Sequence, residues 1–274
     1  VRHERDAVVA HLAQIAPDAV PADQDEIPGT GRAVACALAA LPAELTGPVV
    51  VTSGDVPLLD TATLEALVAQ HCERGDAVTL LTAELDDPAG YGRVIRAGGP
   101  DALAVAGVVE HRDATPEQRA VREINAGVYV FDAAHLRAAL ATLGTDNDQG
   151  EIYLTDVVAR AHSRGLSADH WLVEGCNDRV QLAALGAELN RRVLRRWMVE
   201  GVGVTDPSST WVDVTVELAR DVELEPGALL RGRTRVGEGA RVGAYSILTD
   251  VDIPAGAVVA PFSLLDGDAP ARGV

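Results

Sequence analysis

The stretch "VGEGARVGAYSILTDVDIPAGAVV", residues 236–259, carries an aliphatic residue about every six positions, and glycine follows the first two. In a parallel β-helix, each such hexad points one aliphatic side chain inward at a corner, and glycine permits the turn. The repeat therefore predicts a left-handed parallel β-helix of about ten hexads, or about three coils, between residues 205 and 265. The inward positions expected from this spacing are Val236, Val242, Leu248, Ile253 and Val258.

A single long helix is expected directly before the repeat, over residues 179–200, "RVQLAALGAELNRRVLRRWMVE". Apolar residues recur there every three or four positions, which places them in one stripe along a helix. The stripe consists of Leu182, Leu185, Leu189, Val193 and Trp197. We therefore expect a first domain over residues 1–178, a linker helix over residues 179–201 and the β-helix over residues 202–274.

The first domain alternates short apolar runs with amphipathic segments. "PVVVTSG", "DAVTLLTAEL" and "NAGVYVFD" read as strands, and "LDTATLEALVAQHCERG" reads as a helix that ends at Gly75. Strands that alternate with helices of about ten or more residues favour an α/β layer with a mostly parallel sheet.

Composition excludes several classes of function. The chain has 274 residues, of which 47% are hydrophobic and 3% aromatic, so the core must be aliphatic. The net charge is -18 and all 23 basic residues are Arg, which argues against binding nucleic acid through a basic face. Cys36, Cys72 and Cys176 are scattered, which fits a reducing cytoplasm. Since no apolar run approaches about 20 residues, we expect no membrane span.

The stretch "VVVTSGDVPLL", residues 49–59, ends a hydrophobic strand on Ser53, Gly54 and Asp55. Ligands in open α/β sheets bind at the carboxyl ends of strands, and Gly54 lets another backbone or a ligand approach closely. Asp55 therefore either holds a metal ion beside a nucleotide or simply occupies a turn.

A second candidate is "QDEIPGTG", residues 24–31, in which Gly29 and Gly31 flank Thr30 before a helix. Such a turn offers free N–H groups, and the Gln24 amide can donate and accept at once, as the imide edge of uracil requires. The alternative is an ordinary helix start. The segment is not a P-loop, because the ending Gly-Lys-Ser/Thr is absent.

Three further segments carry polar candidates. Gly92 lies in "DDPAGYGRV", Glu110 could accept hydrogen bonds from sugar hydroxyls, and Asn125 could bond an amide or a hydroxyl. Asn177, in "VEGCNDR", opens the long helix, where Asn is also a strong N-cap. Each of these residues taken alone fits a turn or surface position equally well.

In order along the chain, the motifs resemble one family. They are "QDEIPGTGRA", "VVVTSGDVPLL", "DDPAGYGRVI", "VEHRDATPEQ", "EINAGVYVF", "GEIYLTDVV" and "VEGCNDRVQLA", followed by hexapeptide repeats. The combination resembles the bacterial bifunctional N-acetylglucosamine-1-phosphate uridylyltransferase / glucosamine-1-phosphate N-acetyltransferase family, from about residue 20 to at least residue 265.

The resemblance implies a Rossmann-like nucleotidyltransferase domain that joins UTP to N-acetylglucosamine 1-phosphate, giving UDP-N-acetylglucosamine and pyrophosphate. It implies that Gln24, Gly29 and Thr30 hold the uridine, that Asp55 and Asn177 bind Mg²⁺, and that Gly92, Glu110 and Asn125 hold the acetylated sugar, with Ser53 and Gly54 beside them. It also implies a homotrimer formed through the β-helix.

The chain departs from the family pattern at both ends. The family opens with a glycine-rich loop that bears an Arg and is followed by a Lys, whereas this chain starts after that region and contains no Lys. We therefore expect the first strand and the phosphate loop to be missing, and little uridylyltransferase activity from the chain as given. The family's acetyltransferase centre lies on coils beyond residue 274. The alternatives are another sugar-1-phosphate nucleotidyltransferase, or a non-catalytic remnant that acts as an oligomerisation module.

Overall fold

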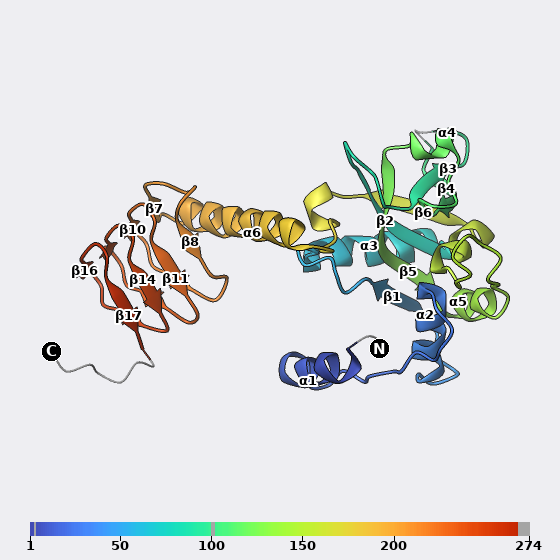
Figure 1. The fold of residues 1–274 in the computed structure, drawn as a ribbon, viewed down its shortest axis with the longest axis horizontal. Helices are drawn as coiled ribbons and strands as arrows, with labels where there is room; N and C mark the ends of the chain where they lie inside the picture. The colour runs from blue at the N-terminus through green and yellow to red at the C-terminus, as the bar shows by residue number, and fades with distance from the viewer. Residues whose placement is uncertain (3, 100–101, 268–274) are drawn as a thin grey trace. The chain divides into compact units, whose positions relative to one another are not determined.

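The computed structural model describes residues 1–2, 4–99 and 102–267, and the chain divides into two compact units, Val1–Gly175 and Cys176–Val274. The first unit is an α/β layer, as predicted (Figure 1). Its helices are α1 (Arg5–Ile15), α2 (Thr30–Ala39), α3 (Thr61–Arg74), α4 (Pro116–Arg119) and α5 (Ala133–Leu140), with the 3₁₀ segments η1 (Leu154–Arg160) and η2 (His170–Leu172). Its strands are β1 (Pro48–Thr52), β2 (Val78–Glu84), β3 (Arg93–Arg96), β4 (Ala104–Val109), β5 (Glu123–Asp132) and β6 (Ser163–Ser167).

The sheet of the first unit is mixed, so the expectation of a mostly parallel sheet is wrong. Its strand order is β1-β5-β2-β6-β4-β3, and β3 also pairs with β5 at one position. Among the described strands, β2 and β6 pair in parallel and the other neighbours are antiparallel. The reason is that β5 runs antiparallel between β1 and β2, which the α3 crossover leaves pointing the same way. The last residue of β1 and the first residues of β5 therefore lie toward the same end of the sheet.

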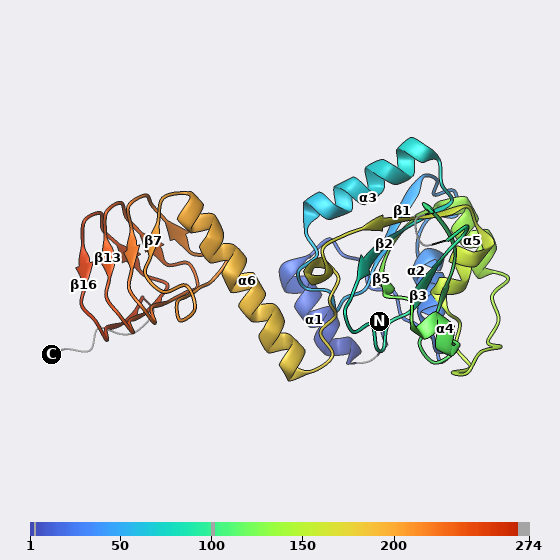
Figure 2. The ribbon, with the colours of Figure 1, turned by 90° about the horizontal axis from the view of Figure 1, so that it is seen from above.

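Two aliphatic clusters hold the layers of this unit together. On one face, α2, α5 and η1 contribute Leu38, Leu136 and Val157 to a cluster that includes Phe131 of β5. On the other face, α3 contributes Leu67 to a cluster with residues of β2 and β5 (Figures 1 and 2). Each fully buried aliphatic side chain of this kind stabilises a fold by about 1.5–3 kcal/mol.

The second unit begins with α6 (Arg179–Val199), and none of the helices in the described residues is long and apolar enough to cross a membrane. Short strands follow α6 in coils: β7 (Gly203–Val204), β8 (Trp211–Val212), β9 (Glu217–Leu218), β10 (Glu223–Leu224), β11 (Leu229–Arg231), β12 (Arg235–Val236), β13 (Arg241–Val242), β14 (Ile247–Thr249), β15 (Asp252–Ile253), β16 (Val258–Val259) and β17 (Leu264–Asp266). They form three parallel sheets, β16-β13-β10-β7, β17-β14-β11-β8 and β15-β12-β9 (Figure 2). This arrangement confirms the predicted parallel β-helix.

The inward positions of the β-helix agree with the hexad spacing except at its last coil. Val236, Val242 and Leu248 are fully buried, as predicted. Val258 is 76% exposed, however, and Val259 takes the inward position instead. The shortened step of this coil lies between Leu248 and Ile253, which are only five positions apart, and the six-residue spacing then resumes, so Val259 is the next inward residue after Ile253. Val258 precedes Val259 in the same strand and therefore points outward, because successive side chains of a strand alternate between its two faces.

The stripe predicted on α6 is only partly buried. Val193 and Trp197 pack against the β-helix core, but Leu182 and Leu189 are exposed. The reason is that α6 contacts β7 and β8, which lie beside its later turns. Within that contact the buried Asn190 side chain donates to the carbonyl of Thr210 at 2.8 Å and accepts from the N–H of Val212 at 3.1 Å. An amide therefore anchors this helix together with aliphatic packing.

A buried carboxylate ties β2 to β6. Asp76, just before β2, has a side chain with 0% exposure. Its Oδ1 accepts hydrogen bonds from His162 Nδ1 at 2.9 Å and from Arg164 Nε at 3.0 Å, while Oδ2 has no hydrogen-bond partner among the residues that the structure describes. A buried charge that loses a partner destabilises a protein strongly, because the remaining charge is neither solvated nor paired.

We predict that Arg164→Met destabilises the first unit by about 3 kcal/mol, because it leaves the Asp76 carboxylate buried beside His162 alone. Hydrogen exchange of the amides in β2 should accelerate by about a hundredfold, at about 1.4 kcal/mol for each factor of ten. The control is Asp86→Ala, which removes a fully exposed partner of Arg122 and should leave exchange in β2 unchanged. Equal exchange rates in parent and Arg164→Met would show that this ion pair does not hold the two strands together.

Candidate functional site

The candidate residues around Asp55 lie where β1 ends against the start of β5. The N–H of Ser53 donates to the carbonyl of Gly127 at 3.1 Å, which fixes the chain immediately after β1. Gly127 has φ +70°, and a Cβ atom there would lie 2.6 Å from Ser53 Oγ, so only glycine fits without movement. Ser53, Gly54 and Asp55 then emerge as exposed residues at the sheet edge.

The Asp55 carboxylate is exposed and forms no hydrogen bond or ion pair within the described part of the chain. By contrast, Asp60, five residues later, caps α3 by accepting from the N–H of Thr63 at 2.8 Å. A turn aspartate ordinarily accepts such backbone bonds. The carboxylate of Asp55 therefore remains available to a ligand.

The loop over residues 24–31 is held together by its own glutamine. Gln24 Nε2 donates to the carbonyls of Ile27 at 3.0 Å and Gly29 at 3.2 Å. Both amide hydrogens thus have partners inside the loop, and the amide oxygen is the part of Gln24 left to accept a bond from a ligand. Gly29 is the N-cap of α2 with φ +113°, and any Cβ there would collide with the backbone of Ile152.

A second segment of the chain pins the start of α2. The N–H of Gly31 donates to the carbonyl of Ile152 at 2.9 Å, and the N–H of Ile152 donates to that of Pro28 at 3.2 Å. Thr30 Oγ1 accepts from the N–H of Leu154 at 3.2 Å. The orientation of this loop is therefore fixed by residues more than a hundred positions later in the sequence.

Gly92, Glu110 and Asn125 come together across three strands. Gly92 lies just before β3 and Glu110 just after β4, which pair antiparallel. A Cβ on Gly92 would lie 2.9 Å from Val108 Cγ1 and 3.4 Å from Glu110 Oε2. The N–H of Asn125, in β5, donates to the carbonyl of Gly92 at 2.9 Å. A side chain at position 92 would therefore collide with Val108, and glycine allows the backbone to lie this close to the Glu110 carboxylate.

The Asn125 side chain is oriented by its neighbours. Nδ2 donates to the hydroxyl of Tyr129 at 2.6 Å, and Oδ1 accepts from the N–H of Gly127 at 3.3 Å. Burial raises the pKa of the Tyr129 hydroxyl, which stays protonated. Tyr129, like Gly127, was not singled out by the sequence, where it reads as one more residue of a hydrophobic strand.

The Glu110 carboxyl has a raised pKa, chiefly because it is withdrawn from solvent. Thr155 Oγ1 donates to Glu110 Oε1 at 3.0 Å, and this bond lowers the pKa in part. Asp113, Asp156 and Glu151 raise it further by repulsion. Sequence reasoning missed Thr155, although it lies within the motif "GEIYLTDVV".

Asn177 belongs to the second unit, at the start of α6. It is not the N-cap: Asp178 is, because its Oδ1 accepts from the N–H groups of Val180 and Gln181, both at 2.8 Å. The Asn177 N–H donates to Gln181 Oε1 at 2.7 Å, and its exposed side chain makes no hydrogen bond within the described residues. The capping alternative for Asn177 is therefore wrong, and its amide oxygen is free for another role.

The available donors suit Mg²⁺ better than a transition metal. No group of three or more His, Cys, Asp or Glu residues within the described ranges could hold a metal ion. Mg²⁺ typically binds one or two protein oxygens and keeps several waters. The carboxylate of Asp55 and the side-chain amide of Asn177, which belong to different units, are each of the oxygen type that Mg²⁺ binds.

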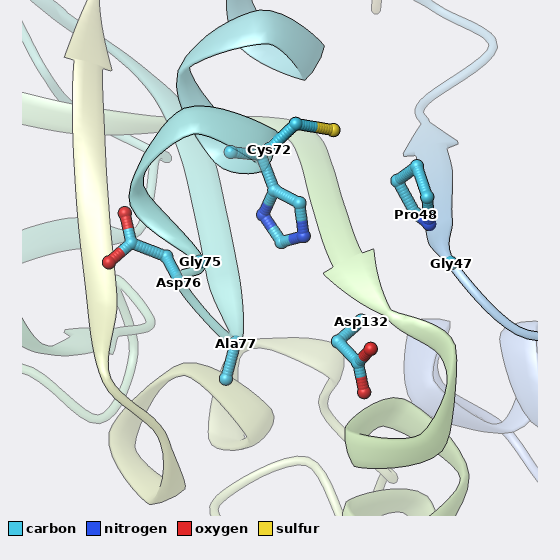
Figure 3. A pocket seen from close by; sticks show the side chains of 8 residues that line it. Gly47, Pro48, Cys72, Gly75, Asp76, Ala77 and Asp132 are labelled. Atoms are coloured by element: carbon cyan, nitrogen blue, oxygen red, sulfur yellow. The ribbon is translucent and has the colours of Figure 1, made fainter.

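A separate pocket of about 410 Å³ lies at the opposite edge of the sheet, where β1 and β2 begin and β5 ends. Its lining residues are Gly47, Pro48, His71, Cys72, Gly75, Asp76, Ala77 and Asp132. Figure 3 shows the Asp76 carboxylate directed away from Asp132. None of the candidate substrate residues lines this pocket.

His71 of this pocket is buried, and its Nδ1 is 3.0 Å from Thr79 Oγ1. Burial lowers the pKa of His71 below 6.5, and the carboxylates of Asp76 and Asp132 oppose that shift only in part. The unfolded chain therefore binds a proton at this residue more readily than the folded chain does. The contribution of His71 to the free energy of unfolding should be complete above pH 6.5 and should be lost as the pH drops below that value.

We predict that His71→Gln flattens this dependence, because Gln has no titrating ring but still reaches Thr79. The measurement is urea unfolding of parent and variant at about pH 7.5 and about pH 5.5. His11→Gln, at an exposed position of α1, is the control and should keep the slope of the parent. An unchanged slope in His71→Gln would contradict the assignment of the acid sensitivity to this residue.

Comparison with known proteins places the chain in a family. The family model described as Nucleotidyl transferase matches residues 2–214. The chain is 54% identical over 265 residues to the Bifunctional protein GlmU of Kineococcus radiotolerans, 56% over 267 residues to that of Pseudarthrobacter chlorophenolicus and 53% over 267 residues to that of Paenarthrobacter aurescens. These alignments cover 94% of this chain and 53%, 54% and 53% of the respective relatives, so the chain spans about half the length of the curated relatives it matches.

Proposed function

The chain belongs to the nucleotidyl transferase family, and on that premise we propose that it binds UTP and N-acetylglucosamine 1-phosphate for uridylyl transfer, which yields UDP-N-acetylglucosamine and pyrophosphate. UDP-N-acetylglucosamine is a precursor of the cell envelope. The observation that carries this proposal is the cluster of Gly92, Glu110 and Asn125 beside the end of β1.

The uridine would bind at the loop over residues 24–31. Gln24 Oε1 is left to accept from the imide N–H of uracil, because its amide nitrogen is engaged within the loop. Gly29 and Thr30 would pack against the base, since Ile152 and Leu154 hold them rigidly. Because the loop is already ordered, binding of the base would cost less conformational entropy.

The acetylated sugar would bind beside Gly92 and Glu110, on the side of the carboxylate that carries Oε2. Glu110 Oε2 would accept hydrogen bonds from ring hydroxyls, and Asn125 would contact the acetamido group or a hydroxyl. A site whose buried acceptors expect hydroxyl donors rejects analogues that lack them, because those acceptors would remain unpaired. Ser53 and Gly54 would lie between the bound sugar and Asp55.

In this reaction a phosphate oxygen of the sugar phosphate attacks the α-phosphorus of UTP, and pyrophosphate leaves. The attacking oxygen is already ionised, so none of these residues needs to act as a general base. Asp55 and Asn177 would supply oxygens to Mg²⁺. When bound, this ion neutralises charge between the two anions and aligns them.

The prediction for the metal ligands concerns UDP-N-acetylglucosamine binding in the presence of Mg²⁺. Isothermal titration should give weak binding to the parent chain that falls at least about tenfold in Asp55→Ala, since a charged ligand bond is lost. Asp18→Ala, another exposed carboxylate, is the control and should bind as the parent does. Equal binding by Asp55→Ala and parent would refute the metal assignment, and absence of binding by the parent would refute the proposed substrate.

The β-helix offers a surface for association with further copies of the chain. The outward positions of the sheet β17-β14-β11-β8 carry Trp211, Leu229, Ile247 and Leu264 in register. By contrast, the other two sheets carry the outward ion pairs Glu223–Arg241 and Glu217–Arg235. A contiguous exposed apolar strip beside charged faces is typical of an interface. We propose that this strip is covered by other copies of the chain, in a homotrimer.

We predict that Leu264→Glu weakens this assembly. Leu264 is 73% exposed, so the charge can be solvated in the monomer but would be buried without a partner in the trimer. Light scattering coupled to size exclusion should give a trimer mass for the parent and a smaller mass for the variant. Val258→Glu, on the neighbouring sheet and equally exposed, is the matched control and should remain trimeric. A monomeric parent, or a trimeric Leu264→Glu, would contradict the proposal.

The same apolar strip favours one alternative, a non-catalytic chain whose role is oligomerisation. A trimeric parent that binds no uridine nucleotide would support this alternative over the enzyme.

A cytoplasmic location is also proposed, because Cys36, Cys72 and Cys176 are all free thiols.

A further inference from the structure

The segment over residues 152–155 contacts both halves of the candidate site. Ile152 exchanges backbone hydrogen bonds with Pro28 and Gly31 of the loop before α2. The N–H of Leu154 donates to Thr30 Oγ1. Thr155, the next residue, bonds Glu110 on the other side. The segment therefore lies between the loop over residues 24–31 and the carboxylate beside Gly92.

The Thr155 hydroxyl determines which oxygen of Glu110 lies on the side of Gly92. Thr155 is 4% exposed, and its Oγ1 donates to Oε1 of Glu110 at 3.0 Å. Oε2 is the oxygen directed toward the position where Gly92 lacks a side chain. Since η1 packs closely on β4, with Ala159 against Gly107, Thr155 has little freedom to move away.

We propose that Thr155 is a positioning residue for sugar recognition: its hydroxyl holds Oε1 of Glu110 so that Oε2 is presented to the hydroxyls of the sugar. Through Ile152 and Leu154, the same segment holds this carboxylate in register with the loop for the base. The inference rests on the proposed function, because it takes Glu110 as an acceptor for an N-acetylhexosamine ring.

The surroundings of Glu110 explain why an orienting donor matters there. Thr155 acts on this carboxyl through a hydrogen bond. The charged groups that act on it are Asp113, Glu151 and Asp156, and all three raise its pKa. The hydroxyls of Tyr129 and Tyr153 also lie close enough for the charge of Glu110 to affect them. Without the bond from Thr155, the pKa of Glu110 would rise further, and a protonated carboxyl is a poorer acceptor for two sugar hydroxyls.

The experiment compares two probes, UDP-N-acetylglucosamine and UDP, by isothermal titration of the full chain with Mg²⁺. Thr155→Val removes the donor at nearly constant volume and should weaken binding of UDP-N-acetylglucosamine by about tenfold while leaving UDP unchanged. Thr155→Ser keeps the hydroxyl and should restore most of the affinity. Thr210→Val, in the second unit, removes the hydroxyl bond of another buried threonine to the carbonyl of Asp206 and is the matched control for both probes.

The pH dependence of the affinity gives a second measurement, which would be the same in parent and Thr155→Val if Thr155 had a purely structural role. The affinity of the parent for UDP-N-acetylglucosamine should fall as Glu110 becomes protonated, and in Thr155→Val this fall should begin at a higher pH. Equal loss of both probes in Thr155→Val would make the hydroxyl structural and overturn the inference, as would unchanged binding of UDP-N-acetylglucosamine. If the parent binds neither probe, the proposed function itself fails.

Discussion

The position of β5 between β1 and β2 is the constraint on which the rest of the first unit depends. Because β5 runs antiparallel to both neighbours, its middle pairs with the end of β1, at Thr52 and Val128, and its first residues pair with the end of β2. Asn125 and Asp55 therefore lie toward the same end of the sheet. The contact between β5 and the end of β1 is close only because Gly127 adopts a positive φ against Ser53. A sheet with β1 and β2 directly paired would place Asn125 elsewhere and separate the candidate sugar ligands from the end of β1.

Local features of the fold could be predicted from sequence because they depend on neighbouring residues. Gly75 ends α3 as expected, since a left-handed C-cap is a chemical property of a single residue. The hexad repeat predicted the β-helix because each coil repeats the same burial requirement. The antiparallel insertion of β5 could not be predicted in this way, since the alternation of strands and helices favours parallel pairing and the position of β5 depends on contacts with β1 and β2 far away in the sequence. The outward position of Val258 was missed because the five-residue step from Leu248 to Ile253 is a single interruption of the repeat, after which the six-residue spacing resumes at Val259.

The candidate site was predictable as a set of residues but not as a geometry. Motif likeness singled out Gly92, Glu110 and Asn125, which the structure brings together across β3, β4 and β5. It did not single out Thr155, because a threonine at the start of a helical turn looks like a local feature, and its hydrogen bond reaches Glu110 far back in the chain. The loop glutamine shows the reverse case: Gln24 was expected to donate to a ligand, yet its amide hydrogens close its own loop.

The charge of the site suggests a division between its two ends. At the sugar end, Glu110 stands among Asp113, Glu151 and Asp156, an arrangement that repels phosphate but suits hydroxyl donors. Under the proposed function, the phosphates would lie away from this cluster, toward Asp55, where a carboxylate without a partner would repel them as well unless a cation lay between. A divalent ion held by the Asp55 carboxylate would supply that positive charge. The proposed selectivity for a sugar and the proposed requirement for an ion would thus arise from the same acidic surroundings.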